Sequence, residues 1–160
     1  MDKKQMIRFV ISLAACFAAS GLGGIFVTRE SITVWYAGMN RPAFTPPDWV
    51  FGPVWTVLYL LMAVSFFIIW DKAGSSPNGR KAIRLFLIQL ALNAAWTPLF
   101  FGAHLLAVSF IEIILLWSAI LATIIVFRTI SSRASILLVP YLIWVGYASV
   151  LNGFLWHLNR

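Results

Sequence analysis

Three short aromatic segments carry most of the recognisable chemistry of this sequence. WTVLY at residues 55–59 recurs as WTPLF at residues 96–100, and WVGY follows at residues 144–147. An indole offers a wide flat surface for stacking and one N–H donor, which needs a partner when it is buried. The tryptophan that begins each segment is therefore either a packing residue or part of the wall of a cavity for a large planar ligand. The residues alone leave both interpretations open.

The sequence has few side chains suited to other kinds of chemistry. The single cysteine, Cys16, allows no intramolecular disulfide or thiolate metal site, and His104 and His157 are isolated, without metal-binding spacing. GLGG at residues 21–24 lies inside an apolar run, so it is not a phosphate-binding loop. We find no Ser-His-Asp or Cys-His set, and we expect neither a metal nor a cofactor. Aromatic surface with a few amides favours the binding of a planar ligand over hydrolysis or group transfer.

A few polar side chains interrupt the apolar runs. Gln89 and Asn93 are one helical turn apart, and Asn152 follows Trp144 by eight positions, so each pair shares a helix face. These amides either hydrogen-bond between helices or contact a ligand. Glu112 is the only acidic residue well inside an apolar run, which makes it a functional candidate, a hydrogen-bonded structural carboxyl or a helix-interface contact.

The elements that position these residues are predicted to be membrane helices. The 160 residues are 61% hydrophobic and 11% charged, and the mean hydropathy is +0.90. A helix of about 20 apolar residues crosses a hydrocarbon core of about 30 Å. Runs of this kind cover residues 6–27, 50–70, 82–102, 105–127 and 134–157. We therefore expect an all-α bundle of five transmembrane helices in a single domain, residues 1–160.

The first apolar run has a second interpretation. Basic residues precede it and small residues follow, as in a secretory signal peptide. However, the apolar stretch continues to Val27, which is long for a signal core, so we favour a membrane span. Ala15, Ala19 and Gly23 repeat every four positions, a spacing that lets a neighbouring helix approach closely. That neighbour is either another helix of the bundle or a second copy of the chain.

Charge predicts the orientation of the bundle. Alternate ends and loops collect nine basic residues on one side: Lys3, Lys4, Arg8, Lys72, Arg80, Lys81, Arg84, Arg128 and Arg133. The other side has only Arg29, Arg41 and Arg160. Because basic residues stay in the cytoplasm, we expect a bacterial inner-membrane protein with a cytoplasmic N-terminus. The net charge of +7 is then explained by topology and phospholipid head groups, and we expect no nucleic-acid partner.

The loop between the first two spans is unusual. Residues 28–49 form a connection of about 22 residues that is rich in aromatic residues and proline. Loops longer than about 12–15 residues are usually functional or disordered, and this apolar composition argues against disorder. We expect an ordered lid.

Three segments resemble a known family. WYAGMNRPAFTPPDWVFGPVWTVLY at residues 35–59, LNAAWTPLFFG at 92–102 and PYLIWVGYASVLN at 140–152 closely resemble the tryptophan-rich sensory protein family, TspO. Its mitochondrial members are the translocator protein, or peripheral-type benzodiazepine receptor, and the resemblance covers nearly the whole chain in order. It implies a five-helix bundle, usually a homodimer, with a pocket closed by the first loop. It also implies porphyrin ligands such as protoporphyrin IX, cholesterol in mitochondria, and isoquinoline carboxamide or benzodiazepine-type drugs.

The resemblance also implies a set of pocket residues. By motif match they are Tyr36, Pro46, Phe51, Trp55, Tyr59, Asn93, Trp96, Trp144 and Ala148. Trp55 and Trp144 match the pair tied to light-dependent porphyrin breakdown in some members, so they are the candidate catalytic residues. The mitochondrial sterol motif requires a tyrosine that residues 150–160 lack, and we therefore expect no sterol ligand.

Three functions remain open on these grounds. The first is a receptor or sensor that binds porphyrins, and the second is a light- or oxidant-dependent porphyrin-degrading enzyme. The third is a transporter of tetrapyrroles or sterols, which we rank last because five spans without an inverted repeat offer no obvious alternating-access machinery.

Overall fold

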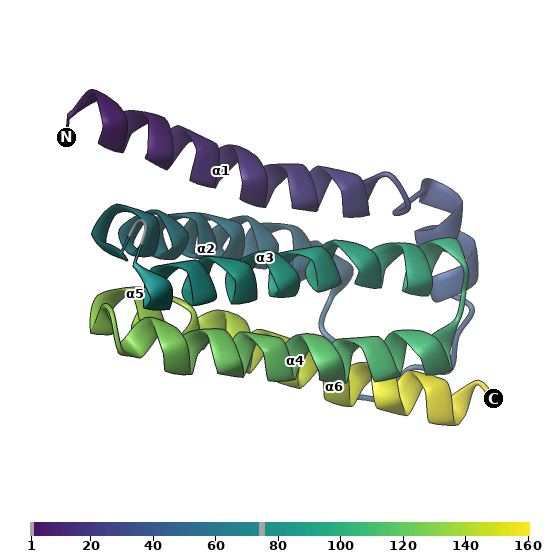
Figure 1. Ribbon diagram of the computed structural model, residues 1–160. Helices are drawn as coiled ribbons and strands as arrows, with labels where there is room; N and C mark the ends of the chain where they lie inside the picture. The colour runs from purple at the N-terminus through teal and green to yellow at the C-terminus, as the bar shows by residue number, and fades with distance from the viewer. Residues whose placement is uncertain (1, 74–75) are drawn as a thin grey trace.

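Long helices lie side by side along one direction (Figure 1). The computed structural model describes residues 2–73 and 76–160. The helices are α1 (Lys3–Gly24), α2 (Phe51–Ala73), α3 (Pro77–Thr97), α4 (Leu106–Arg128), the short α5 (Ser132–Leu137) and α6 (Val139–Leu158). Five helical segments are long and apolar enough to cross a membrane, and each predicted run falls on one of them. The prediction of an all-α, five-helix membrane bundle is confirmed.

The first helix begins earlier than the apolar pattern predicts. The backbone N–H of Gln5 donates to Asp2 Oδ1 at 2.7 Å, and the N–H of Asp2 donates to Gln5 Oε1 at 3.1 Å. This reciprocal capping box satisfies backbone donors that the first turn leaves free, so the helix starts before its apolar residues. Asp71, near the end of α2, accepts from Gln5 and from Arg8, each at 3.0 Å, and so ties α1 to α2.

Close packing of α1 against α3 explains the small residues of the first span. A Cβ added at Gly23 would lie 3.1 Å from Thr97 Oγ1, and both Ala19 and Gly23 are buried. The two helix backbones approach closely where glycine removes the side chain. At Gly23 the predicted contact is therefore with another helix of the same bundle.

Prolines mark the two places where a long helix changes its geometry. The chain passes from α3 into a π-helical turn, η3 (Pro98–Gly102), and the fifth span is divided into α5 and α6 next to Pro140. Proline has no N–H to donate to the preceding turn, so the regular hydrogen-bond ladder stops at these points. The sequence predicted the fifth span as one element over residues 134–157, whereas the structure begins it at Ser132 and divides it at Leu138.

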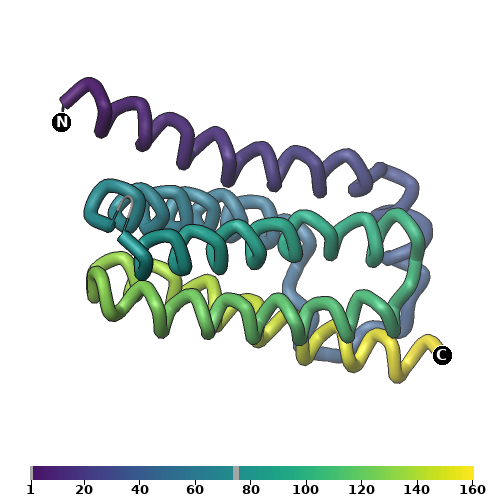
Figure 2. Tube along the Cα trace, viewed as in Figure 1, coloured from purple at the N-terminus to yellow at the C-terminus, as the bar shows by residue number. Residues whose placement is uncertain are grey.

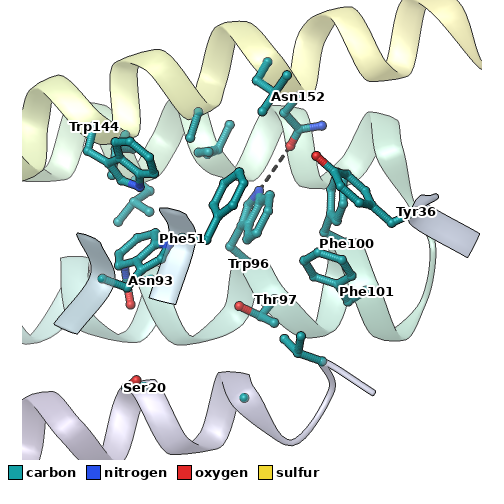
Figure 3. Close-up of a pocket in the computed structure, with 18 of the residues that line it drawn as sticks. Ser20, Tyr36, Phe51, Asn93, Trp96, Thr97, Phe100, Phe101, Trp144 and Asn152 are labelled. Carbon is teal, nitrogen blue, oxygen red and sulfur yellow. Dashed lines mark hydrogen bonds between the residues drawn. The ribbon is translucent and has the colours of Figure 1, made fainter. Parts of the chain in front are cut away.

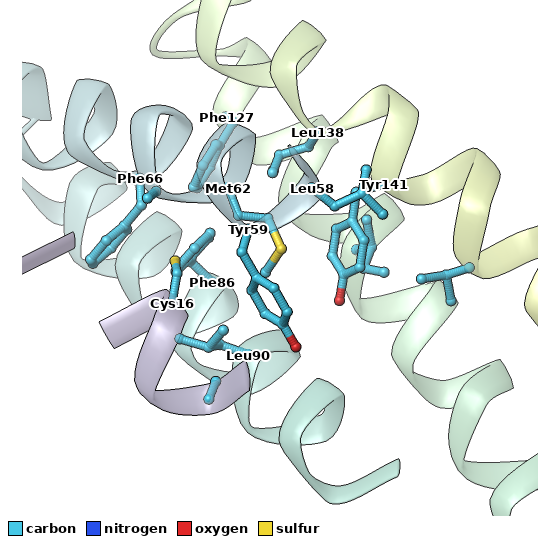
Figure 4. Packing of buried hydrophobic residues seen from close by; sticks show 14 of the residues in the cluster. Cys16, Leu58, Tyr59, Met62, Phe66, Phe86, Leu90, Phe127, Leu138 and Tyr141 are labelled. Atoms are coloured by element: carbon cyan, nitrogen blue, oxygen red, sulfur yellow. The ribbon is translucent and has the colours of Figure 1, made fainter. Parts of the chain in front are cut away.

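Large side chains fill the half of the bundle where α3 begins and α4 ends. Phe86 stacks between Phe66, at 4.3 Å, and Phe127, at 6.0 Å between ring centroids. Met62 and Leu138 are likewise almost fully buried in this cluster (Figure 4). These side chains fill the space between the helices in this half of the bundle.

The first loop is ordered and covers the other half of the bundle. It contains a short π-helical segment, η1 (Ser31–Tyr36), and a single turn, η2 (Asp48–Val50), which leads into α2. Figure 2 shows the loop crossing from the end of α1 towards α6 before it returns. Tyr147 donates to the Phe44 carbonyl at 2.7 Å, and Asn159 makes two hydrogen bonds with the Asn40 backbone, at 2.9 and 3.0 Å. The loop is therefore fastened to both the middle and the end of α6.

Candidate ligand-binding site

A cavity of about 270 Å³ lies between the helices beneath this loop (Figure 3). Its walls come from α1, the loop, α2, α3, η3, α4 and α6. The lining residues are Ser20, Gly24, Val27, Ile32, Tyr36, Asp48, Phe51, Trp55, Tyr59, Asn93, Trp96, Thr97, Phe100, Phe101, Ile113, Leu116, Trp144, Val145, Ala148, Leu151, Asn152 and Leu155. The surface is mainly aromatic and aliphatic, with a few polar groups between.

Eight of the nine residues predicted for the pocket line this cavity. They are Tyr36, Phe51, Trp55, Tyr59, Asn93, Trp96, Trp144 and Ala148. Pro46 does not line it and instead borders a separate depression on the outer side of the loop, together with Arg41 and Thr45. The residues that the loop presents to the cavity are Val27, Ile32, Tyr36 and Asp48.

Flat rings face the cavity from three sides. Trp55 lies 5.5 Å from Tyr59 on α2, and Phe51 meets Trp144 edge to face at 5.8 Å. Trp96 stacks on Phe100 with the ring centroids 4.7 Å apart and the planes inclined by 20° (Figure 3). Aromatic pairs of this kind hold one another in fixed orientations, so the cavity offers rigid stacking surfaces.

A buried hydrogen-bond chain crosses the bundle behind the cavity. The Tyr59 hydroxyl donates to Asn93 Oδ1 at 2.6 Å, and Asn93 Nδ2 donates to the Tyr141 hydroxyl oxygen at 2.9 Å. The chain links α2, α3 and α6, and Tyr141 is completely buried. Asn93 therefore hydrogen-bonds between helices, as one alternative for this amide predicted, and it also lines the cavity, where contact with a ligand stays a prediction.

The two tryptophans Trp96 and Trp144 differ in whether the indole N–H is hydrogen-bonded. The indole N–H of Trp96 donates to Asn152 Oδ1 at 3.1 Å, and Asn152 Nδ2 donates to the Leu106 carbonyl at 3.3 Å. Trp144 differs, because its Nε1 is buried and meets no hydrogen-bond acceptor in residues 2–73 or 76–160. Since a buried N–H without a partner is costly, the Trp144 indole is suited to an acceptor atom of a ligand.

Two other polar candidates lie away from the cavity lining. Gln89 and Glu112 are both buried, at 1% and 8% exposure, and neither borders the cavity. Within the described part of the chain, no group hydrogen-bonds to the Gln89 amide or to either Glu112 oxygen. The described residues therefore do not support the interpretation of Glu112 as a hydrogen-bonded structural carboxyl.

Ring and charge contacts hold the loop over the cavity. Trp35 stacks on His104 with ring centroids 4.0 Å apart and planes 11° from parallel. Arg41 lies 5.2 Å from the centre of the Tyr36 ring and 3.4 Å from an oxygen of Asp48. Burial raises the pKa of the Tyr36 hydroxyl above its usual value, although Arg41 acts in the opposite direction. Tyr36 is thus a neutral hydrogen-bonding group at the cavity mouth.

Sequence reasoning missed several lining residues. Ser20 and Gly24 come from α1, and Thr97 and Phe101 follow the Trp96 segment. The repeat of small residues on α1 indicated a close helix contact but not which helix it would meet. Thr97 lies beside Trp96 in the repeated segment, which was the available signal for it.

The arrangement defines a class of protein: an integral membrane helical bundle with an aromatic cavity beneath an ordered loop. The model of the TspO/MBR family matches residues 12–157. The chain is 41% identical over 155 residues to the tryptophan-rich protein TspO of Archaeoglobus fulgidus, covering 97% of this chain and 99% of that protein. It is 37% identical over 140 residues to the translocator protein of Homo sapiens, covering 87% of this chain and 82% of that protein. The chain belongs to the TspO/MBR family.

Proposed function

We propose that this protein is a membrane receptor for tetrapyrroles of the protoporphyrin IX type, which bind in the aromatic cavity. The supporting observation is that Trp55, Trp96 and Trp144 all line one cavity beneath the first loop. Stacking on several indoles suits a large planar macrocycle. The unpartnered N–H of Trp144 adds a directional donor for an acceptor group of the ligand.

A tetrapyrrole is larger than the cavity, so its binding requires a movement of the loop. The cavity of about 270 Å³ lies just below the range of about 300–1,000 Å³ usual for ligand pockets, and a macrocycle needs more room than a drug-sized molecule. Isoquinoline carboxamide and benzodiazepine-type compounds are then the smaller ligands of the same cavity. A tetrapyrrole enlarges the cavity by moving the loop, whose position reports occupancy. This coupling is the physical basis of the sensory role.

A pair of tryptophan insertions on α6 tests the binding site. Ala148→Trp places a large ring in the cavity, whereas Val150→Trp, on the same helix, places it at a position 53% exposed on the outside of the bundle. We expect saturable quenching of tryptophan fluorescence by protoporphyrin IX in the dark for the wild type and for Val150→Trp, and at least a tenfold weaker affinity for Ala148→Trp. Equal affinities in all three proteins would place the ligand elsewhere.

The second candidate is a light-dependent porphyrin oxidase. In that reaction dioxygen is the oxidant and the light-excited macrocycle is oxidised: the indole of Trp55 or Trp144 gives one electron to dioxygen and takes one back from the macrocycle. The favouring observation is that both indoles line the same cavity. Trp144→Phe keeps an aromatic surface but removes the oxidisable indole. Loss of the absorbing photoproduct with retained dark binding would support the enzyme, whereas a product formed at the wild-type rate would exclude Trp144 from the reaction.

We also propose a bacterial inner-membrane location, a cytoplasmic N-terminus and a homodimer. The basic residues of α1, α3 and α4 lie at the end of the bundle opposite the first loop (Figure 1). Ser76→Cys and Arg160→Cys lie at opposite ends, so a membrane-impermeant thiol reagent distinguishes the two orientations. Labelling of Ser76→Cys in intact cells would contradict the assignment.

A further inference from the structure

A basic surface lies at the end of the bundle where α3 begins and α4 ends, remote from the cavity. Lys81 and Arg84 lie on the first turns of α3, and Arg128 ends α4, the helix that packs beside it (Figure 1). Arg133 follows at the start of α5. All four side chains are exposed. Among residues 2–73 and 76–160, no carboxylate pairs with any of them, so their charge is available to a partner.

On α3 the basic surface continues directly into an apolar one. Leu87 and Ile88 follow Arg84 by three and four positions and therefore lie on the same helix face. They are 47% and 53% exposed, and Ala91, one turn further, is exposed as well. Since α3 is a membrane-spanning helix, this stripe faces hydrocarbon while Arg84 and Lys81 lie near the head groups.

This order of groups matches the chemistry of one kind of molecule. A lipid with acyl chains along Leu87 and Ile88 would bring its phosphate, about one helical turn or 5.4 Å further along, to Arg84 and Lys81. Guanidinium and ammonium groups bind phosphate oxygens by charge-assisted hydrogen bonds. A head group with net negative charge is favoured over a zwitterionic one, because within residues 2–73 and 76–160 no carboxylate pairs with these four cations, and Asp71, at the same end, is paired with Arg8.

The opposite end of the bundle lacks this surface. Its basic residues are Arg29, Arg41 and Arg160, and they share that end with Glu30 and Asp48. Arg41 is already paired with Asp48 at 3.4 Å. The concentration of unpaired positive charge is therefore a property of the end where α3 begins and α4 ends, and not of the membrane boundary in general.

We propose that Lys81 and Arg84, with Arg128 beside them, form a binding site for an anionic phospholipid whose acyl chains lie along Leu87 and Ile88. The site is separate from the aromatic cavity. It takes a lipid such as phosphatidylglycerol from the leaflet that contains the basic end of the protein, and it stabilises the α3–α4 pair there.

Paired charge substitutions of equal size test this site. The double variant Lys81→Gln with Arg84→Gln removes two positive charges at the proposed site, and Arg29→Gln with Arg160→Gln removes two at the other end. Native mass spectrometry of each detergent-purified protein, titrated with dioleoyl phosphatidylglycerol or phosphatidylcholine, gives the affinities. We expect the wild type and the control to prefer phosphatidylglycerol. We expect the test variant to bind phosphatidylglycerol about 30-fold more weakly at low salt, since each cation near an anionic lipid surface contributes roughly a fivefold factor.

Four results would overturn the proposal. The first is an equal loss of phosphatidylglycerol binding in both double variants, and the second is equal affinity of the wild type for the two lipids. The third is a Leu87→Gln variant that changes from dimer to monomer with unchanged phosphatidylglycerol affinity, which would assign the apolar stripe to a second copy of the chain. Inorganic phosphate serves as a further probe, and displacement of the lipid by millimolar phosphate would show a free-anion site without a role for the acyl chains.

Discussion

The Asn93 amide offers the sharpest test of how the bundle is held together around the cavity. Asn93→Leu keeps a side chain of similar size and removes the two hydrogen bonds to Tyr59 and Tyr141. Tyr59 borders the cavity, so its hydroxyl is not enclosed by protein on every side. The hydroxyl of Tyr141 is fully buried and loses its donor, so its partner cannot be replaced by solvent.

The size of the effect follows from these differences. Interhelical hydrogen bonds in membrane proteins contribute about 0.6 kcal/mol on average and up to about 1.7 kcal/mol. A buried polar group left without a partner costs about 1–3 kcal/mol. We therefore expect Asn93→Leu to lower the free energy of unfolding by about 2 kcal/mol and Tyr141→Phe to lower it by about 1 kcal/mol. The double variant should lose about 2 kcal/mol, less than the sum of the two single effects. In the double variant the Tyr141 hydroxyl is absent, so no buried polar group is left without its partner.

Unfolding by sodium dodecyl sulfate in mixed micelles, followed by circular dichroism, measures these free energies. Asn78→Leu is the matched control, because it makes the same substitution at an exposed position in the first turn of α3. It should change stability by less than about 0.5 kcal/mol. A stability of Asn93→Leu equal to that of this control, or strictly additive effects of Asn93→Leu and Tyr141→Phe, would refute the reasoning.

Two further predictions concern backbone positions. Gly23→Leu should destabilise the bundle by about 1–3 kcal/mol, because its Cβ would lie 3.1 Å from Thr97 Oγ1, whereas Gly21→Leu, with no atom within 4 Å of a Cβ, should not. Equal unfolding midpoints for the two variants would contradict the α1–α3 contact. His104 has a φ of 57°, so His104→Gly should be more stable than His104→Ala by about 1 kcal/mol, although both lose the stack on Trp35. Thermal unfolding compares them, and a more stable alanine variant would show that the backbone there is not strained.

The helices could be predicted because the signals for them are local. Continuous apolar runs ended by basic residues fixed the five spans, and the composition of residues 28–49 predicted an ordered loop. The start of α1 was placed too late, since the capping box of Asp2 and Gln5 precedes the apolar residues. The division of the fifth span at Leu138 was also missed, because it depends on how the chain adjusts next to Pro140.

The candidate site was predictable where the resemblance supplied motifs and not where packing decides. Trp55, Trp96 and Trp144 line one cavity, as the resemblance implied, whereas their shared segments alone left packing as an alternative. Tyr141 was not anticipated, because its role depends on meeting Asn93 from another helix. Pro46 lies outside the cavity lining because the loop turns its proline segment outward, and loop conformation is not encoded by a helical or strand period.

We propose that the aromatic cavity beneath the first loop is the tetrapyrrole site. The most direct measurement is an experimental structure of the protein with protoporphyrin IX bound in the dark. We expect the macrocycle to lie between Trp55, Trp96 and Trp144, within hydrogen-bond distance of Trp144 Nε1, with the loop displaced from its contacts with α6. A macrocycle bound on the outer surface of the bundle, with this cavity unchanged, would contradict it.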